Sequence, residues 1–470
     1  MHQLESRMET STSGLPGNAA VEGDPTPPRS SYIYRIAATA ATSGFLFGFD
    51  TAVINGALLS LREEFRLTEF QTEIAVSSLL VGCLIGAALA GTLTDRFGRK
   101  RVLLAAAMLF ALSSLGTALP HALSQFIGAR LVAGVAIGVA SVLAPMYIAE
   151  ASPPHIRGRL VSLNQVAITA GILCAFLISW MLSGFGPSSW RLMFAVAAVP
   201  SIVFFLSLLF VPESPRWLIQ AGRTETALRV LRKISGARAD NEAQEIRLSL
   251  LEESGTLREI LAPHLRRPLS IAVTLAVLSQ ITGINTVIYY GALLFREHGG
   301  QNNASSAIGE NVIVGIVSLL SAILATAVID RVGRKALLLI GSAGMAISLG
   351  LLGVALKASQ PPSGLIMFLV TVYVGFFGIS LGPVTWVYIA ELFPTAIRGR
   401  AMSAATLALW AACLAVALSF LALMNLLSPS GAFWLYAMLS AVTFLFVWRW
   451  LPETKGRSLE QIQQMWRRGE

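Results

Sequence analysis

The stretch Ala401–Trp448 contains no charged residue over 48 consecutive positions. About 20 apolar residues in a helix span the hydrocarbon core of a bilayer, so this stretch is too long for one crossing. The segment Asn425–Gly431, with the sequence NLLSPSG, interrupts it near its middle with residues typical of a turn. The stretch therefore predicts two membrane-spanning helices joined by a short turn.

Other long stretches are equally free of charge, among them Ile74–Thr94, Val102–Pro120 and Ala336–Leu356. Of all residues 54% are hydrophobic and 13% charged, with a mean hydropathy of +0.67, whereas soluble domains carry roughly 25% charged residues. We therefore predict an all-α polytopic membrane protein with about twelve transmembrane helices. The predicted spans are 33–60, 74–94, 102–120, 124–149, 160–183, 191–211, 268–295, 308–329, 336–357, 364–391, 401–424 and 432–451.

The net charge of +9 does not indicate a nucleic-acid binder, because the Lys and Arg residues lie between apolar stretches rather than in one patch. Basic residues follow the second, fourth, eighth, tenth and last predicted spans, and the intervening loops are poor in them. Lys and Arg accumulate on the cytoplasmic side of membrane proteins. The pattern predicts a multi-pass protein of the plasma (inner) membrane with both termini in the cytoplasm.

Residue types that carry catalysis or bind metals are not grouped in this sequence. The cysteines Cys83, Cys174 and Cys413 fall within predicted spans, which indicates packing residues rather than a disulfide framework. The five histidines have no ligand spacing, and there is no nucleophile elbow, phosphate loop or pair of catalytic carboxylates. We expect no metal, no cofactor and no enzymatic activity.

Three motifs occur twice in the same order, about half a chain length apart. This repetition predicts two six-helix halves in parallel duplication, an architecture of alternating-access carriers whose solute site lies between the repeats. The pairs are YIAEASPPHIRGR at 147–159 with YIAELFPTAIRGR at 388–400, GTLTDRFGRK at 91–100 with ATAVIDRVGRK at 325–335, and PESPRWL from Pro212 with PETKGRSL from Pro452.

The repeats divide the chain into five parts. Between the halves, the charged periodic sequences TETALRVLRKI and EAQEIRLSLLEE predict short amphipathic helices in the cytoplasm. The parts are a disordered N-terminal tail at 1–32, a six-helix half at 33–212, a linker with these helices at 213–267, a second half at 268–452 and a C-terminal tail at 453–470.

The ordered series DRFGRK, PMYIAEASPPHIRGRLVSLNQ, PESPRWL, QITGIN, GPVTWVYIAELFPTAIRGR and PETKGRSL resembles the sugar porter branch of the major facilitator superfamily. It is most similar to bacterial proton-coupled pentose and hexose symporters, and the resemblance covers residues 34–465. It implies the major facilitator fold, a sugar or polyol as substrate, a proton as the co-transported ion and function as a monomer.

Carboxylates and arginines sit together at the cytoplasmic ends of the predicted spans. Arginine can bind a carboxylate through two bonds, so these groups can form a latch that holds the cytoplasmic side shut. The alternative interpretation is topology signals with solvated charge, since exposed pairs contribute only about 0–1 kcal/mol. The carboxylates are Asp95, Glu150, Glu213, Asp330, Glu391 and Glu453, and the arginines are Arg99, Arg157, Arg216, Arg334, Arg398 and Arg457.

Two charges lie inside predicted spans, where charge is costly: Asp50 in the first and Arg130 in the fourth. We expect them to face the interior of the first half and to pair. Burial favours the neutral carboxyl and the arginine favours the ionised one, so the pair can bind a proton in one conformation and release it in another. The resemblance implies the same roles, proton carrier for Asp50 and partner for Arg130. A static structural ion pair is the alternative.

Neutral polyhydroxylated ligands are bound by amide and indole groups, and Gln165, Gln280, Asn285 and Trp386 match sugar ligands of the family. A straight helix would place residues 280 and 285 about 140° apart, so we expect Gly283 to unwind the seventh span.

Three further features concern the same region. Gly382-Pro383 is expected to break the tenth span in a similar way. Tyr289 lies one turn beyond Asn285 and is expected to close the outer side of the site. Phe47 is expected to line the cavity beside Asp50.

Three positions depart from the family pattern. Ser279 replaces the first of two glutamines, Ser318 an eighth-span asparagine, and Leu409, just before Trp410, an eleventh-span amide. Each lost contact can change discrimination by about 1–3 kcal/mol, so the identity of the sugar or polyol stays open. The resulting hypothesis is import of a monosaccharide with a proton by alternating access; the alternatives are a passive sugar or polyol facilitator and a non-transporting sugar sensor.

Overall fold

The computed structural model describes residues 30–252, 263–298, 304–358, 362–393 and 395–455. Within these ranges all regular secondary structure is helical. Long uncharged sequences form helices because every backbone polar group in a bilayer needs a partner, and a helix supplies one within the segment. The predicted all-α class is confirmed.

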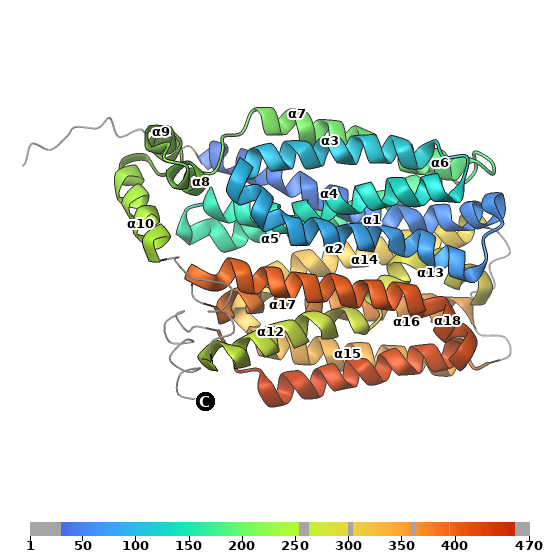
Figure 1. The fold of residues 1–470 in the computed structure, drawn as a ribbon. Helices are drawn as coiled ribbons and strands as arrows, with labels where there is room; N and C mark the ends of the chain where they lie inside the picture. The colour runs from blue at the N-terminus through green and yellow to red at the C-terminus, as the bar shows by residue number, and fades with distance from the viewer. Residues whose placement is uncertain (1–29, 253–262, 299–303, 359–361, 394, 456–470) are drawn as a thin grey trace, which may run out of the picture.

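The first six spans form one half of the molecule, drawn in blue to green in Figure 1. The sixth span consists of two helices separated at Ala197. The helices of this half are α1 (Ser30–Phe65), α2 (Glu69–Phe97), α3 (Arg99–Ala118), α4 (Leu123–Glu150), α5 (Pro154–Leu182), α6 (Ser189–Val196) and α7 (Ala198–Leu209).

The second half, yellow to red in Figure 1, lies beside the first. In the described chain, eleven helical segments are long and apolar enough to cross a membrane, and the last, Gly399–Trp450, holds two crossings. Its backbone turns at Ser428, with φ 64° and ψ 163°, inside the predicted turn. The helices are α12 (Pro263–Ile281), α13 (Ile284–His298), α14 (Ala304–Val332), α15 (Arg334–Ala355), α16 (Ser363–Ile379), α17 (Leu381–Leu392) and α18 (Thr395–Trp450).

Three short helices follow the first half: α8 (Pro215–Gln220), α9 (Thr224–Ser235) and α10 (Ala239–Glu252), with a 3-10 turn at Gly236–Arg238. They lie at one end of the bundle, where α1 begins and α18 ends (Figure 1). The helices expected between the halves are thus present. We call this the α10 end and the opposite end the outer end.

Facing glycines set the contact between α2 and α4. At Gly82 and Gly86 of α2, and at Gly134 and Gly138 of α4, an added Cβ would lie closer than 3.0 Å to the backbone of the other helix. Small residues four apart allow two membrane helices to approach to backbone contact. Larger residues at these positions would force the helices apart.

The seventh span is broken between α12 and α13, as expected from Gly283. This glycine has φ +90°, a conformation that other residues adopt rarely. The ring of Tyr436 lies 2.8 Å from the position that a Cβ would take, and the hydroxyl of Tyr373 donates to the carbonyl of Thr282 at 2.9 Å. The break therefore has its own conformational and packing support.

The tenth span is also broken, but the expected position at Gly382-Pro383 is wrong. The non-helical residue is Ser380, with φ −127° and ψ −96°, and Gly382 and Pro383 lie in the first turn of α17. Proline is tolerated in a first turn, where its missing N–H would have no partner, and its ring clashes with the residue four positions before it. The helix therefore ends at Ile379, upstream of the proline.

Candidate functional site

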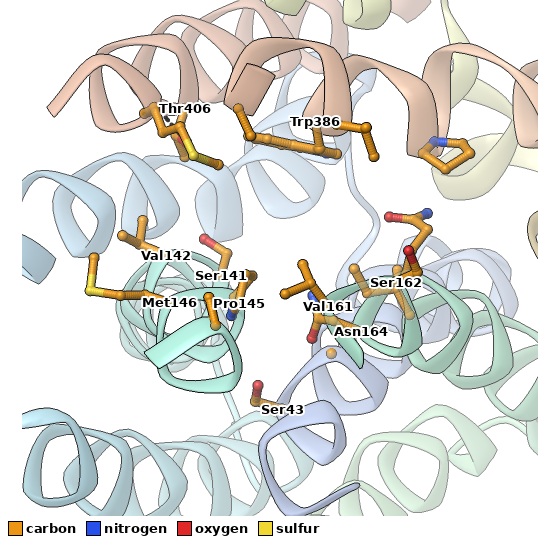
Figure 2. A pocket seen from close by; sticks show the side chains of 18 of the residues that line it. Ser43, Ser141, Val142, Pro145, Met146, Val161, Ser162, Asn164, Trp386 and Thr406 are labelled. Atoms are coloured by element: carbon orange, nitrogen blue, oxygen red, sulfur yellow. Dashed lines mark hydrogen bonds between the residues drawn. The ribbon is translucent and has the colours of Figure 1, made fainter. Parts of the chain in front are cut away.

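A cavity of about 2370 Å³ lies between the two halves. In Figure 2, Trp386 and Thr406 of the second half face Ser141, Pro145 and Asn164 of the first half across it. The lining continues to the α10 end, where it includes residues of α9 and α10 such as Ser235 and Glu242. This volume exceeds the roughly 300–1,000 Å³ of ordinary small-molecule pockets, so the cavity comprises a central site and a wide vestibule toward the α10 end.

At the outer end the two halves are in direct contact. Arg296 of α13 pairs with Glu63 of α1 at 3.1 Å, and Ser183, which directly follows α5, meets Ser305 of α14 at 2.8 Å between hydroxyl oxygens. Asn425 of α18 bonds Glu69 of α2. The cavity is therefore open toward the α10 end and sealed at the outer end.

The break in the seventh span brings two predicted sugar ligands together. Nδ2 of Asn285 donates to Oε1 of Gln280 at 2.6 Å and to Sγ of Cys413 at 3.1 Å. The hydroxyl of Tyr289 lies 3.5 Å from the same sulfur. All four residues line the cavity. Cys413, which the sequence indicated only as a packing residue, is therefore part of this polar cluster.

Aromatic residues line the same cavity. Phe47 of α1 and Trp410 of α18 meet edge to face, with ring centroids 5.5 Å apart. Trp386 and Gln165 also line the cavity. The structure thus places all six predicted substrate-binding residues around one space.

Two polar groups at the cavity were missed as ligand candidates. Nε1 of Trp410 and Oδ1 of Asn164 are buried and have no hydrogen-bond partner among the described residues, and both residues line the cavity. Buried polar groups are normally partnered, and these two atoms have almost no accessible surface in this conformation, so each would bond a ligand only after its side chain turns toward the cavity. Trp410 follows Leu409, and Asn164 precedes Gln165, and both of these neighbours were considered as positions at the sugar site. The sequence does not show which of two adjacent side chains points into a cavity.

The three departures from the family pattern also lie at the cavity: Ser279, Ser318 and Leu409 all line it. The hydroxyl of Ser279 donates to the carbonyl of Ala276 at 2.7 Å and accepts from Nε2 of Gln280 at 3.0 Å. It therefore orients Gln280. The wall formed by Leu409 is apolar where an amide was expected.

Asp50 and Arg130 pair, as expected from their isolation in apolar spans. Nη1 of Arg130 lies 3.1 Å from Oδ1 of Asp50, and the two residues are 1% and 5% exposed. The guanidinium carbon lies 5.4 Å from the ring centroid of Phe194. Among the described residues, Oδ2 of Asp50 and Nε of Arg130 have no partner. The pair lies within the first half, beside Gly48 and Thr51, which line the cavity.

The carboxylates and arginines at the α10 end form two matching clusters, one in each half. Arg99 bonds Glu150 at 2.8 and 2.9 Å, and Arg334 bonds Glu391 at 2.8 and 3.1 Å. These pairs join helices of the same half. Asp95 and Asp330 lie 4.0 and 3.0 Å from the respective arginines.

Glu213, one of the carboxylates expected to pair with an arginine side chain, caps the start of α3. It accepts from the backbone N–H groups of Arg99 and Lys100 at 2.9 and 3.0 Å, and Glu453 does the same for Arg334 and Lys335 at 3.0 Å each. The first N–H groups of a helix lack intrahelical partners and attract a carboxylate.

Arg216 lines the cavity and donates to the hydroxyl of Ser249 at 3.2 Å. The remaining predicted members of the clusters, the side chains of Arg157 and Arg398 and the whole of Arg457, lie outside the described residues.

In the part of the chain that the structure describes, eleven apolar helical segments, the last of which turns back at Ser428, form two halves around a cavity open at one end, and this arrangement defines a membrane transporter. The chain belongs to the sugar transporter family of the major facilitator superfamily, since the family described as "Sugar (and other) transporter" matches residues 36–466.

Known proteins agree with this assignment. The arabinose-proton symporter of Bacillus subtilis (strain 168) is 39% identical over 93% of this chain and 95% of its own length. The D-xylose-proton symporter of Escherichia coli (strain K12) is 37% identical over 93% of this chain and 96% of its own. A structure of the E. coli xylose transporter XylE, in a partially occluded inward open conformation, has a TM-score of 0.82 and 35% identity, covering 91% of this chain and 100% of that one.

Proposed function

We propose that this chain imports a monosaccharide together with a proton across the plasma membrane by alternating access. The observation that carries the proposal is the buried contact between Asp50 and Arg130, 3.1 Å apart. The two relatives named as proton symporters, for arabinose and D-xylose, support it.

The sugar binds among neutral donors and acceptors at the centre of the cavity. Gln165, Gln280 and Asn285 offer amide groups that both donate and accept, which suits hydroxyl groups. Trp386 and Trp410 offer ring surface and indole N–H groups for the sugar ring. Because this set carries no charge, it favours a neutral polyhydroxylated solute over an anion.

Asp50 carries the proton. When it is ionised, the charge-assisted bond holds Arg130 in place, and when it is protonated that bond weakens. Phe47 is one helical turn before Asp50 and lines the cavity, so a change at the pair reaches the sugar site along α1. Binding of a proton and of a sugar thereby favour the same conformational change.

The α10 end is the cytoplasmic side, where both termini lie, and the described conformation faces the cytoplasm. The positive-inside rule supports this orientation, as does the likeness to an inward open structure of XylE. The two arginine–carboxylate clusters come together as a latch when this side closes. The chain works as a monomer, because each copy contains a complete cavity.

The test is uptake by the full-length protein in proteoliposomes, with pentoses, hexoses, polyols and inositols offered with and without an inward proton gradient. We expect uptake of a monosaccharide above its external concentration only with the gradient. Asp50→Asn should abolish accumulation while leaving sugar exchange intact, and Asp240→Asn, at an exposed carboxylate, should leave both intact. Uptake that ignores the gradient would instead establish a passive facilitator, and binding without transport would establish a sensor.

A further inference from the structure

A chain of hydrogen bonds runs from the backbone of α12 across the break in the seventh span to Asn285 at the start of α13. It begins at the carbonyl of Ala276, which accepts from the hydroxyl of Ser279 at 2.7 Å. Nε2 of Gln280 donates to that hydroxyl at 3.0 Å, and Oε1 of Gln280 accepts from Nδ2 of Asn285 at 2.6 Å. The chain therefore connects a fixed backbone group to a side chain that lines the cavity.

The hydroxyl of Ser279 sets the direction of every bond in this chain. A carbonyl oxygen has no hydrogen, so the single hydroxyl hydrogen of Ser279 lies between Oγ and the oxygen of Ala276. Oγ can then only accept from Gln280, which places the nitrogen of that amide toward Ser279 and its oxygen toward Asn285. That oxygen in turn requires the nitrogen of Asn285. Ser279 is 1% exposed, so water does not compete for the bond that starts the chain.

Cys413 takes up the second N–H of Asn285. Its Sγ lies 3.1 Å from Nδ2, and the cysteine is 1% exposed on α18. Sulfur accepts hydrogen bonds weakly, so this contact supports an orientation that the bond to Gln280 already sets. An amide nitrogen carries two hydrogens, and those of Asn285 are both directed to partners within the protein.

The carbonyl oxygen Oδ1 is the part of Asn285 that is left for a ligand. Among the described residues it has no hydrogen-bond partner, and it does not belong to the enclosed polar atoms without a partner, such as Oδ1 of Asn164. It therefore keeps surface that is accessible from the cavity, which Asn285 lines. A carbonyl oxygen accepts and cannot donate. The ligand group opposite it must donate, as a hydroxyl does and a fluorine or an ether oxygen does not.

We propose that Ser279 and Cys413 are positioning residues that make Asn285 an acceptor-only contact, and that this contact selects a sugar with a free hydroxyl at the position facing it. The inference rests on the sugar binding of the proposed function and not on its proton coupling. It gives a role to Ser279, which departs from the family pattern. A glutamine at this position could direct either its oxygen or its nitrogen to Gln280, whereas the serine, bonded to the backbone, can only accept.

Loss of the hydroxyl at position 279 lets the chain reverse. In Ser279→Ala, the amide of Gln280 can turn and direct its nitrogen to Asn285, which then turns as well and presents its N–H groups to the cavity. An N–H group bonds a hydroxyl oxygen and also tolerates a fluorine, so the variant should lose discrimination rather than affinity. A variant that merely packed less well would bind the hydroxyl and the fluorine compound more weakly by the same factor.

The test compares hydroxyl with fluorine at each position of a sugar. The probes are D-glucose, D-xylose and L-arabinose, and the analogues of each in which fluorine replaces one hydroxyl. Dissociation constants are measured by isothermal titration calorimetry on the full-length protein in detergent, so no proton gradient is needed. Ser279→Ala and Cys413→Ala remove the positioning groups, whereas Ser279→Thr keeps a hydroxyl and Cys413→Ser keeps an acceptor. The matched control is Ser342→Ala, at a fully buried serine of α15 outside the cavity lining that donates to the carbonyl of Leu338 at 2.7 Å.

In the wild type, we expect fluorine at one position of a bound sugar to weaken binding about tenfold, because a hydrogen bond is lost and two acceptors face each other. In Ser279→Ala this penalty should fall to about threefold or less, with the affinity for the parent sugar changed by less than about threefold. Cys413→Ala frees one N–H of Asn285 and should give a penalty between these two values. Ser279→Thr, Cys413→Ser and Ser342→Ala should keep the wild-type penalty.

Two results would overturn the inference and leave sugar transport intact. One is an unchanged penalty in Ser279→Ala, and the other is a wild type that binds a sugar but shows no position with such a penalty. A wild type that binds none of the three sugars would instead overturn the proposed function, and this inference with it.

Discussion

A single nitrogen of Arg130, Nη1, donates both to the backbone carbonyl of Asp50 at 3.2 Å and to its carboxylate at 3.1 Å. The arginine is therefore tied to the backbone of α1 as well as to the acid. An asparagine at position 50 would keep the backbone contact, so the chemistry of the carboxylate can be tested without removing the connection between α1 and α4.

The first prediction separates the charge from the fold. Arg130→Met leaves the carboxyl of Asp50 buried without its ionic partner, which should lower the free energy of unfolding by on the order of 3 kcal/mol. Asp50→Asn combined with Arg130→Met should recover most of that loss, since no charge then remains buried. Thermal unfolding of the three proteins in detergent measures the differences. If the double variant is no more stable than Arg130→Met, the unpaired charge of Asp50 is not the cause of the stability lost in Arg130→Met.

The second prediction concerns the indole N–H of Trp410, which has no hydrogen-bond partner among the described residues. Trp410→Phe removes its N–H and keeps an aromatic ring against Phe47, so sugar affinity should fall about fivefold, the effect of one hydrogen bond. Trp410→Leu should lose more, because the edge-to-face contact goes as well. Binding of whichever radiolabelled sugar the uptake experiment identifies as the substrate measures both. Trp434→Phe, at a tryptophan that is 41% exposed, is the control, and equal losses at both positions would remove Trp410 from the site.

The third prediction concerns the break in the seventh span. Gly283→Ala adds a Cβ at φ +90° and 2.8 Å from the ring of Tyr436, which should destabilise the protein by roughly 1–3 kcal/mol. Tyr436→Ala removes the clash but not the backbone strain at position 283. In a Tyr436→Ala background, Gly283→Ala should therefore destabilise the protein less than it does in the wild type. Gly350→Ala meets no atom within 4 Å and serves as the control. If Gly350→Ala and Gly283→Ala lowered the unfolding temperature equally, the positive φ and the contact with Tyr436 would not be the cause of the destabilisation.

The fourth prediction compares the two clusters at the α10 end. The side chains of Arg99 and Glu150 are 6% and 10% exposed, whereas those of Arg334 and Glu391 are 13% and 23% exposed. Since a more buried pair loses more when one partner is removed, Glu150→Gln should lower the unfolding temperature more than Glu391→Gln. Asp330→Asn, at a side chain that is 81% exposed, should have little effect. If Glu150→Gln and Glu391→Gln lowered the unfolding temperature equally, burial would not determine how much each ion pair contributes to stability.

Local properties of the sequence were enough to predict most of the fold. Hydrophobic length located the spans, and Ser428 breaks the long uncharged stretch where its turn residues indicated. Glycine at position 283 marked the seventh-span break because its conformational freedom belongs to the residue itself. The pairing of Asp50 with Arg130 followed from the cost of leaving either charge alone in an apolar span.

Features that depend on how elements meet were not predictable in this way. The tenth span breaks at Ser380 because the effect of Pro383 falls on the preceding turn. Glu73 precedes the predicted second span by one residue and reads as a loop charge, yet it is buried against α18. Whether the indole N–H of Trp410 has a partner among the described residues depends on the directions of side chains from several helices, which one sequence does not specify.

The glycine contact between α2 and α4 holds these two helices together as one rigid unit. Glu73 sits on the outer part of α2 and Arg130 on α4, and between the helices the backbones touch without intervening side chains. We therefore expect that a shift of α2 that withdraws Glu73 from α18 also moves α4, so that the contact between the halves and the buried ion pair of Arg130 change together.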